Sequence, residues 1–289
     1  MIVITGAYGF IGSNLVHYLN SQGVTDLILV DDLTDGIKYK NLLGAQFKSY
    51  YDVDEFFTEF KDWTNVTAVY HQGAVSSTTE TNGKIVMDRN YSFSCKIFDH
   101  VIKYQIPISY ASSASVYGNT SNYSIDPLNL YAYSKSLVDE VVERNLSSFK
   151  RVHGWRYYNV YGNRETHKEN QASPITKFSK QARTLGRIEI FEGSNDIYRD
   201  FVAVDDVIKV ITKFINEQKP SSIRDLGLGR SESFATVAYL VSRKFGDVPI
   251  VTVPFPESLK SGYQYLTRAR PLPEYKFISL TEWLYKNNI

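Results

Sequence analysis

Tyr131 and Lys135 are the two residues of this chain whose types and spacing point most directly to chemistry. They are followed by apolar residues at helical spacing: Leu137, Val138, Val141, Val142 and Leu146. Residues four apart on a helix lie one turn apart on the same face. A lysine ammonium beside a phenol lowers the pKa of the phenol from about 10, so that it can take a proton from a substrate hydroxyl and return it. The alternative is an ordinary surface pair, since such pairs are common.

A serine-rich loop precedes this pair. Residues 110–118 read Tyr-Ala-Ser-Ser-Ala-Ser-Val-Tyr-Gly, which is typical of a strand that ends in a loop. This loop can supply a serine hydroxyl to the same substrate oxygen.

The N-terminal residues indicate the kind of cofactor that would act together with Tyr131 and Lys135. An apolar strand at residues 1–5 is followed by Gly6, Gly9 and Gly12 and by a helical pattern that ends near Gly23. Gly6 permits a tight turn, Gly9 lets backbone amides approach a pyrophosphate, and Gly12 lets helix and strand pack closely. The helix N-terminus, at Phe10 and Ile11, adds partial positive charge. This strand, turn and helix predict dinucleotide binding; a glycine turn without a ligand is the alternative.

The residues at the end of the second predicted strand bear on whether the cofactor is NAD or NADP. Residues 27–31 form an apolar run that ends in Asp31, about 20 residues past the glycines, where an acid holds the adenosine ribose. Lys38 would attract a 2′-phosphate, whereas Asp32 would repel one. These charges favour NAD weakly.

The next strand, at residues 67–71, ends in a small-residue exit at Gly73 and Ala74 that would let the cofactor pass. A polar loop follows at a strand carboxyl end, where open α/β sheets bind ligands: Ser76, Ser77, Thr78, Thr79 and Glu80. The alternative for this loop is a solvated segment with a helix cap at Ser or Thr. Residues 83–104 predict a long helix that carries Asn90, with Cys95 packed in its apolar face.

Strands at residues 106–110 and 151–158 continue an alternation of strands and helices, which predicts a doubly wound parallel sheet of the Rossmann type. The alternation stops after residue 162, where a polar loop contains His167 and Lys168. The remaining elements are expected as helices at 173–185, 204–217 and 232–245 and strands at 188–191, 199–202 and 251–255. We therefore predict a dinucleotide-binding domain over 1–162 plus 199–229, and a smaller substrate-binding lobe over 163–198 plus 230–289.

Composition narrows the class of protein. The chain has 289 residues and a net charge of +1, which gives no electrostatic case for nucleic acid or an acidic membrane surface. A single cysteine excludes an internal disulfide and fits a reducing compartment. Five histidines and one cysteine form no metal-ligand cluster in the sequence. No signal-like segment or bilayer-spanning apolar run is visible, so we expect a cytoplasmic protein without a metal or membrane partner.

The glycine turn, Asp31, the serine loop and the Tyr131/Lys135 pair together resemble the extended short-chain dehydrogenase/reductase family that acts on nucleotide sugars. In that family the serine four residues before the Tyr-Gly of the loop joins the catalytic pair, which here is Ser113. Dehydratases of the family carry an acidic pair in this loop. This chain has Ala114-Ser115-Val116 there, so 4,6-dehydration is not expected.

A closer resemblance, from residue 1 to about residue 267, is to the ADP-glyceromanno-heptose 6-epimerases. The segments that carry it are residues 76–80, 157–162, 167–168, 199–202, 227–234 and 255–264. That family inverts one carbinol carbon of ADP-heptose. The resemblance implies that Tyr131, helped by Lys135 and Ser113, deprotonates the 6-hydroxyl while a nicotinamide takes hydride. The ketone then reorients, and hydride returns to its other face.

The resemblance also implies roles for other residues. Lys168 would be the second acid/base, although a loop lysine alone would be taken as plain surface. Arg199 would clamp the diphosphate, and Tyr263 and Gln264 would close over the nucleotide or phosphates. Asn159, with His167 and the 76–80 loop, would line the sugar pocket. One cofactor per chain would stay tightly bound, in an expected homo-oligomer.

Two departures from the family pattern affect the cofactor and the substrate. The family usually has Asn where Asp32 stands and uses mainly NADP, so NADP follows from the resemblance and NAD stays open. In residues 260–263 a basic residue is shifted out of the family's Lys-Gly-Arg-Tyr, and the tail after Thr267 is short. Two alternatives stay open: another nucleotide-sugar epimerase, such as a UDP-hexose 4-epimerase in which Lys168 is idle, or a non-catalytic NAD(P)-binding protein.

Overall fold

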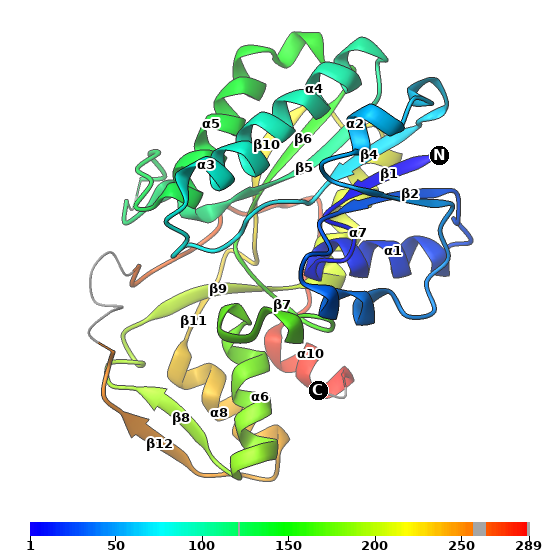
Figure 1. Ribbon diagram of the computed structural model, residues 1–289. Helices are drawn as coiled ribbons and strands as arrows, with labels where there is room; N and C mark the ends of the chain where they lie inside the picture. The colour runs from blue at the N-terminus through cyan, green and yellow to red at the C-terminus, as the bar shows by residue number, and fades with distance from the viewer. Residues whose placement is uncertain (121, 257–263, 288–289) are drawn as a thin grey trace. The chain divides into compact units, whose positions relative to one another are not determined.

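The computed structural model describes residues 1–120, 122–256 and 264–287 (Figure 1). Its strands are β1 (Ile2–Thr5), β2 (Leu27–Asp31), β3 (Ser49–Asp52), β4 (Ala68–His71), β5 (Ile108–Ser113), β6 (Val152–Tyr157), β7 (Asn159–Tyr161), β8 (Ile188–Phe191), β9 (Tyr198–Ala203), β10 (Ser222–Leu226), β11 (Ser231–Ser233) and β12 (Ile250–Val253). Its α-helices are α1 (Phe10–Ser21), α2 (Phe56–Glu59), α3 (Gly83–Val86), α4 (Phe93–Lys103), α5 (Leu130–Arg144), α6 (Pro174–Leu185), α7 (Val204–Asn216), α8 (Phe234–Lys244) and α10 (Leu280–Lys286). Short helical turns include η1 (Gly36–Leu42), η3 (Met87–Ser92), η4 (Ala114–Tyr117) and η6 (Thr166–Gln171).

The first compact unit contains residues 1–116, 127–156 and 208–224. Its seven-stranded sheet has the order β10-β6-β5-β4-β1-β2-β3, and the pairs from β5 through β3 are parallel. All residues of β2 and β4 are buried, as expected for strands covered on both faces. The predicted doubly wound fold is confirmed. The strand order reverses between β1 and β4, which is where such sheets bind ligands.

Helices cover both faces of this sheet. Figure 1 shows α3, α4 and α5 together on one face and α1 on the other. Side chains of β6 alternate between the faces, because Arg156 bonds to Asp139 of α5 while Trp155 packs against Phe214 of α7. The catalytic candidates at the end of β5 and on α5 therefore belong to the sheet and to the helix layer that covers one of its faces, within one compact unit.

The predicted helix over residues 83–104 is interrupted. It consists of α3, the π-helical turn η3 and α4, and Asn90 lies in the π-helical turn with no exposed surface. Such turns are often found at functional sites. Cys95 is half-buried in α4 and hydrogen-bonded with Tyr91, and burial raises the pKa of its thiol.

The second compact unit contains residues 117–126, 157–207 and 225–289, of which the ranges given above are described. It holds a three-stranded sheet, β11-β9-β7, and a parallel pair, β12-β8. Its apolar core gathers side chains from α6, α8 and α10, including Phe178, Val241 and Trp283. Residues 199–207 lie in this unit and 208–224 in the first, so the compact units divide the predicted 199–229 segment. Among the described residues, no helix is long and apolar enough to cross a membrane.

We expect the buried His153 to make the free energy of unfolding depend measurably on pH. Its side chain has no exposed surface, and neither ring nitrogen has a hydrogen-bond partner in the described part of the chain. Burial lowers its pKa to about 4, and Arg151 and Arg224 add to the shift. Because the unfolded state takes up this proton near pH 6.5, the free energy of unfolding falls as pH drops from about 6.5 toward 4.

We expect His153→Phe to raise the free energy of unfolding by about 1–2 kcal/mol at pH 7, since two unpaired nitrogens are removed. The ring still packs against Trp155 and Phe214. Urea unfolding at pH 7 and pH 5 measures both effects. A variant less stable than wild type at both pH values would show that the imidazole is satisfied.

Candidate active site

The two strand exits at the switch point meet at glycines. Gly6, directly after β1, has a φ of +63°, and a Cβ placed there would lie 2.6 Å from the Cα of Gly73, which follows β4. A Cβ on Gly73 would itself lie 3.0 Å from the Gly6 nitrogen. Gly73 also donates its N–H to the Thr5 hydroxyl at 3.2 Å. The predicted turn and the small-residue exit are thus two halves of one backbone contact.

The N-terminus of α1 is suited to an anion. Gly9 is its N-cap and has no side chain to satisfy the first-turn amides, and the first turn contains no acidic residue. A Cβ on Gly12 would lie 2.1 Å from the Gly6 carbonyl oxygen, so close packing of helix and turn requires glycine there. Backbone amides at such a terminus bind phosphate groups. The residues present therefore fit a dinucleotide pyrophosphate.

Asp31 is buried at the end of β2 and bound to three donors. Its carboxylate accepts the Tyr8 N–H at 2.7 Å, the Asp32 N–H at 2.8 Å and the Lys38 ammonium at 2.9 Å. A carboxylate has about four acceptor positions, so one stays available for a ribose hydroxyl. Lys38 also donates to the Asp32 carbonyl, while the Asp32 carboxylate accepts the Thr34 N–H. Lys38 is therefore already paired with Asp31, so the negative charges prevail in the predicted opposition of Lys38 and Asp32.

Ser113, Tyr131 and Lys135 come together where β5 ends and α5 begins. Asn129 caps α5 through the Ala132 N–H, which places Tyr131 in the first turn. Tyr131 shares a side-chain hydrogen bond with Ser113, and Lys135 donates to the Ala111 carbonyl at 2.7 Å. Ser113 also lies 2.8 Å from the Ser115 hydroxyl.

The predicted effect of the lysine on the tyrosine is wrong for the protein without ligands. Burial raises the pKa of Tyr131, and only the hydrogen bond with Ser113 opposes it. Burial also lowers the pKa of Lys135 to about 8, against the charge of Asp139. The burial of Lys135 and the partial burial of Tyr131 outweigh the attraction between an ammonium and a phenolate, because burial penalises each charged form.

A buried chain of hydrogen bonds links the glycine turn to α5. His71 lies 2.5 Å from the Thr5 hydroxyl and 2.8 Å from the Ser94 hydroxyl, and Ser94 donates to the Asn90 carbonyl. Asn90 donates at 2.9 Å to Ser134, whose hydroxyl donates to the carbonyl of Tyr131. Burial lowers the pKa of His71 to about 3, so this histidine is neutral. Asn90 thus positions elements around the predicted cofactor site.

Some side chains of the 76–80 loop form hydrogen bonds with nearby backbone groups rather than pointing free for a ligand. Glu80 accepts the N–H groups of Thr81 and Asn82, and Asn82 caps α3. Ser77 and Thr79 lie with their hydroxyls 3.1 Å apart, and Ser76, Thr78 and Thr79 are exposed. Asn90 bonds to both backbone groups of Val75, the residue before the loop. The helix cap is therefore Asn82, not a serine or threonine of the loop.

In the second unit, His167 and Lys168 lie in η6 and are half-buried. Burial lowers the pKa of Lys168, and the charge of Glu165 opposes this shift. Glu165 is itself buried and accepts hydrogen bonds from the Ser173 N–H and hydroxyl, at 2.8 and 2.6 Å. A partly desolvated lysine is easier to deprotonate than an exposed one, which suits an acid/base.

Arg199 and Gln264 lie beside each other in the second unit. The Arg199 guanidinium is buried and donates to the carbonyls of Tyr198 and Gln264, and the Gln264 amide donates to the Gly118 carbonyl. Asn159 accepts from the Thr267 hydroxyl at 3.4 Å. Tyr263 lies outside the described residues.

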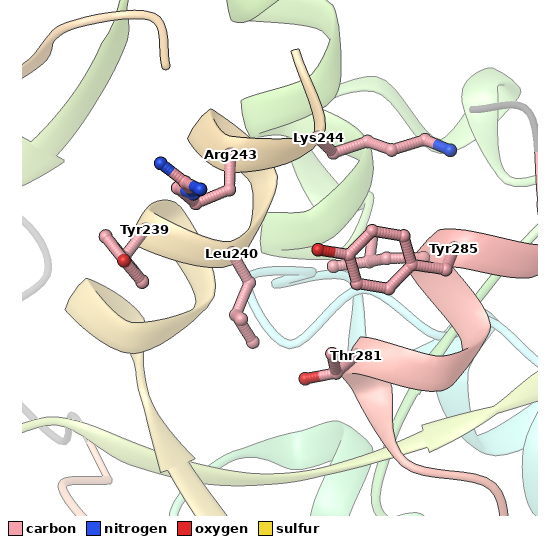
Figure 2. A pocket seen from close by; sticks show the side chains of 7 residues that line it. Tyr239, Leu240, Arg243, Lys244, Thr281 and Tyr285 are labelled. Carbon is pink, nitrogen blue, oxygen red and sulfur yellow. The ribbon is translucent and has the colours of Figure 1, made fainter. Parts of the chain in front are cut away.

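Two hollows of the second unit differ in character. One of about 170 Å³ lies between α8 and α10, and Figure 2 shows Leu240 and Tyr285 facing it from opposite sides; no predicted site residue lines it. Another of about 790 Å³ lies between η6 and α6. Its basic lining residues are Arg164, Lys177, Lys180 and Arg183. This basic groove adjoins the segment that contains Lys168.

Sequence reasoning missed three buried polar residues of this arrangement: His71, Ser134 and Asp139. A signal for Asp139 was present, because it interrupts the apolar pattern of α5 and follows Lys135 by four residues. His71 ended a predicted strand and was given no role.

Fold and site together define a protein of the extended short-chain dehydrogenase/reductase class. It has the glycine turn typical of dinucleotide-binding proteins and a Ser-Tyr-Lys set. Residues 2–227 match the NAD dependent epimerase/dehydratase family. The chain belongs to that family.

Several solved structures are similar over nearly the whole chain. An ADP-L-glycero-D-manno-heptose-6-epimerase from Helicobacter pylori is 26% identical, with a TM-score of 0.83 over 99% of this chain and 94% of that one. A UDP-N-acetylglucosamine 4-epimerase from Methanobrevibacter ruminantium is 21% identical, with a TM-score of 0.83 over 98% and 96%. A Thermus thermophilus UDP-glucose 4-epimerase, solved with NAD, is 22% identical, with a TM-score of 0.81 over 98% and 96%. The last two support the fold alone.

Proposed function

We propose that this protein is a nucleotide-sugar epimerase that inverts a carbinol carbon by transient oxidation, and that its substrate is ADP-heptose, inverted at C6. The observation that carries the proposal is the half-buried Tyr131, hydrogen-bonded with Ser113 and one helical turn from Lys135, in a chain of the epimerase/dehydratase family. The similarity to the Helicobacter pylori enzyme supports the choice of ADP-heptose.

A bound nicotinamide cofactor would supply the hydride acceptor and donor. Gly6, Gly9, Gly12 and Gly73 would hold its pyrophosphate, and Asp31 its ribose. Residues 31–38 contain three acids and one lysine, and that lysine is paired with Asp31. A 2′-phosphate would add two negative charges beside these acids, so we propose NAD rather than NADP.

Tyr131 would remove the proton from the carbinol hydroxyl and later return it. Ser113 would hold the same substrate oxygen, since its hydroxyl already bonds to Tyr131. Lys135 would act as a fixed positive charge that favours the phenolate once the substrate oxygen is in place. The groups move protons while the carbon skeleton stays intact.

The effect of replacing Lys168 distinguishes an epimerase that uses two acid/base groups from one that needs only Tyr131. If Lys168 protonates and deprotonates on the second face, Lys168→Ala is expected to lower the epimerisation rate by about 10²–10⁴. Cofactor content should stay at the wild-type level. Lys209→Ala, on the exposed surface of α7, is the matched control. Equal rates for the two variants would favour the 4-epimerase alternative, in which Lys168 has no role.

The proposal is tested by proton NMR of the purified protein with ADP-D-glycero-D-manno-heptose and no added cofactor. The expected result is the 6-epimer, together with NAD released on denaturation. Conversion of UDP-hexoses instead would identify a different nucleotide-sugar epimerase. A bound cofactor that no nucleotide sugar ever reduces would indicate a non-catalytic protein.

A further inference from the structure

Asp139 continues the face of α5 that carries the site. Tyr131, Lys135 and Asp139 follow one another at four-residue steps, so they lie in a row one turn apart. The Asp139 carboxylate is buried and accepts the Tyr110 hydroxyl at 2.9 Å, the Ser112 hydroxyl at 2.9 Å and the Arg156 Nε–H at 2.8 Å. A buried acid with three donors is a built feature of the fold.

The row holds the end of β5 at three consecutive residues. Tyr110 and Ser112 donate to Asp139, and between them the Ala111 carbonyl accepts the Lys135 ammonium at 2.7 Å. Gly154 of β6 leaves the space for the Tyr110 ring, because a Cβ there would lie 2.4 Å from the Tyr110 hydroxyl oxygen. Ser113, which bonds to Tyr131, is the next residue of the strand.

The groups that act on Lys135 include one negative charge and two neutral side chains. Lys135 is buried, and Asp139 is the acid whose charge acts on it. His71 faces the same lysine and is neutral, and Tyr131 is a neutral phenol in the protein without ligands. Arg156 pairs with Asp139 and lies 3.8 Å from Glu143. Without the Asp139 charge, the Lys135 ammonium would keep its hydrogen bond to the Ala111 carbonyl but lose the negative charge that offsets part of the cost of its burial.

We infer that Asp139 is a positioning residue of the site: its carboxylate keeps Lys135 protonated and holds the end of β5 so that Ser113 reaches Tyr131. This inference rests on the proposed roles of Lys135 and Tyr131. It predicts that loss of the Asp139 charge leaves Lys135 neutral at physiological pH, and that the phenol of Tyr131 then ionises less readily.

The test is an NMR titration of the cofactor-bound protein labelled with ¹³Cε-lysine, in which the Lys135 signal is identified by its loss in Lys135→Arg. Asp139→Asn is expected to lower the pKa of Lys135 by about 1–3 pH units relative to wild type. Arg156→Met is the matched control. It breaks the same buried ion pair but leaves the carboxylate to Lys135, so the pKa of Lys135 should not fall.

A purely structural role for Asp139 predicts another pattern. Both variants would then lose stability and neither would change the Lys135 pKa, which would overturn the inference. If Asp139→Asn alone does not fold, because Arg156 is left unpaired, the double variant Asp139→Asn/Arg156→Met removes both charges and gives the same readout. The titration uses no sugar, so it stands even if the proposed substrate is wrong. With an active substrate, the acidic limb of the pH–rate profile should move to higher pH only in variants that lack the carboxylate.

Discussion

Tyr131→Phe is expected to lower the rate of epimerisation by about 10²–10⁴ without loss of bound cofactor. The substitution removes only the phenolic oxygen, which is the atom that would exchange a proton with the carbinol hydroxyl. The ring stays packed in the first turn of α5. Turnover is measured by NMR with the nucleotide sugar, and cofactor content from the absorbance of the denatured supernatant.

Tyr133→Phe provides the comparison for this result. Tyr133 lies two residues further along α5, is 48% exposed and has the same chemistry. It should turn over at the wild-type rate. If the two variants were equally active, the proton transfer would belong to another group, and the mechanism proposed for Tyr131 would be wrong.

Gly12→Ala is expected to abolish cofactor binding and to lower the free energy of unfolding by about 3 kcal/mol or more. The new methyl carbon would lie 2.1 Å from the Gly6 carbonyl oxygen and 2.9 Å from the Ala7 Cα, both on the backbone. Helix α1 must then move away from the turn, which removes its N-terminus from the pyrophosphate position. Thermal unfolding and cofactor content measure the two effects.

The matched control for this prediction is Gly36→Ala. A Cβ at Gly36 meets no atom within 4 Å, and this glycine does not have a positive φ. The change in stability should stay within about 0.5 kcal/mol. A Gly12→Ala protein that retained a full complement of cofactor would show that the turn does not hold the pyrophosphate.

The parts of the fold that were predictable from sequence depend on local patterns. Glycines six residues apart after an apolar strand, and Gly186 with its φ of +62° at the end of α6, identify turns and helix ends directly. Strands β7 and β11 are three residues long, too short for an alternation to be visible. The π-helical turn at η3, in which Asn90 is buried, has no sequence signature of its own.

The electrostatics of the site were less predictable because they depend on burial. The spacing of Tyr131 and Lys135 indicated that they share a helix face, and the structure confirms this. The spacing did not indicate how far each is withdrawn from water: Lys135 is buried and Tyr131 half-buried, and burial raises the pKa of Tyr131 and lowers that of Lys135. The division of the chain into compact units is likewise set by long-range contacts, so the bounds at 199–229 could not be read from local composition.

The most direct test of the account is epimerisation of ADP-heptose by the holoprotein in D₂O, followed by NMR of the inverted carbon. Hydride that leaves to the cofactor and returns to the other face originates from the substrate itself. The account therefore predicts a 6-epimer that keeps its original hydrogen at C6, with no deuterium from solvent. A product with solvent deuterium at C6 would mean that the carbon is inverted by proton exchange, which would contradict transient oxidation.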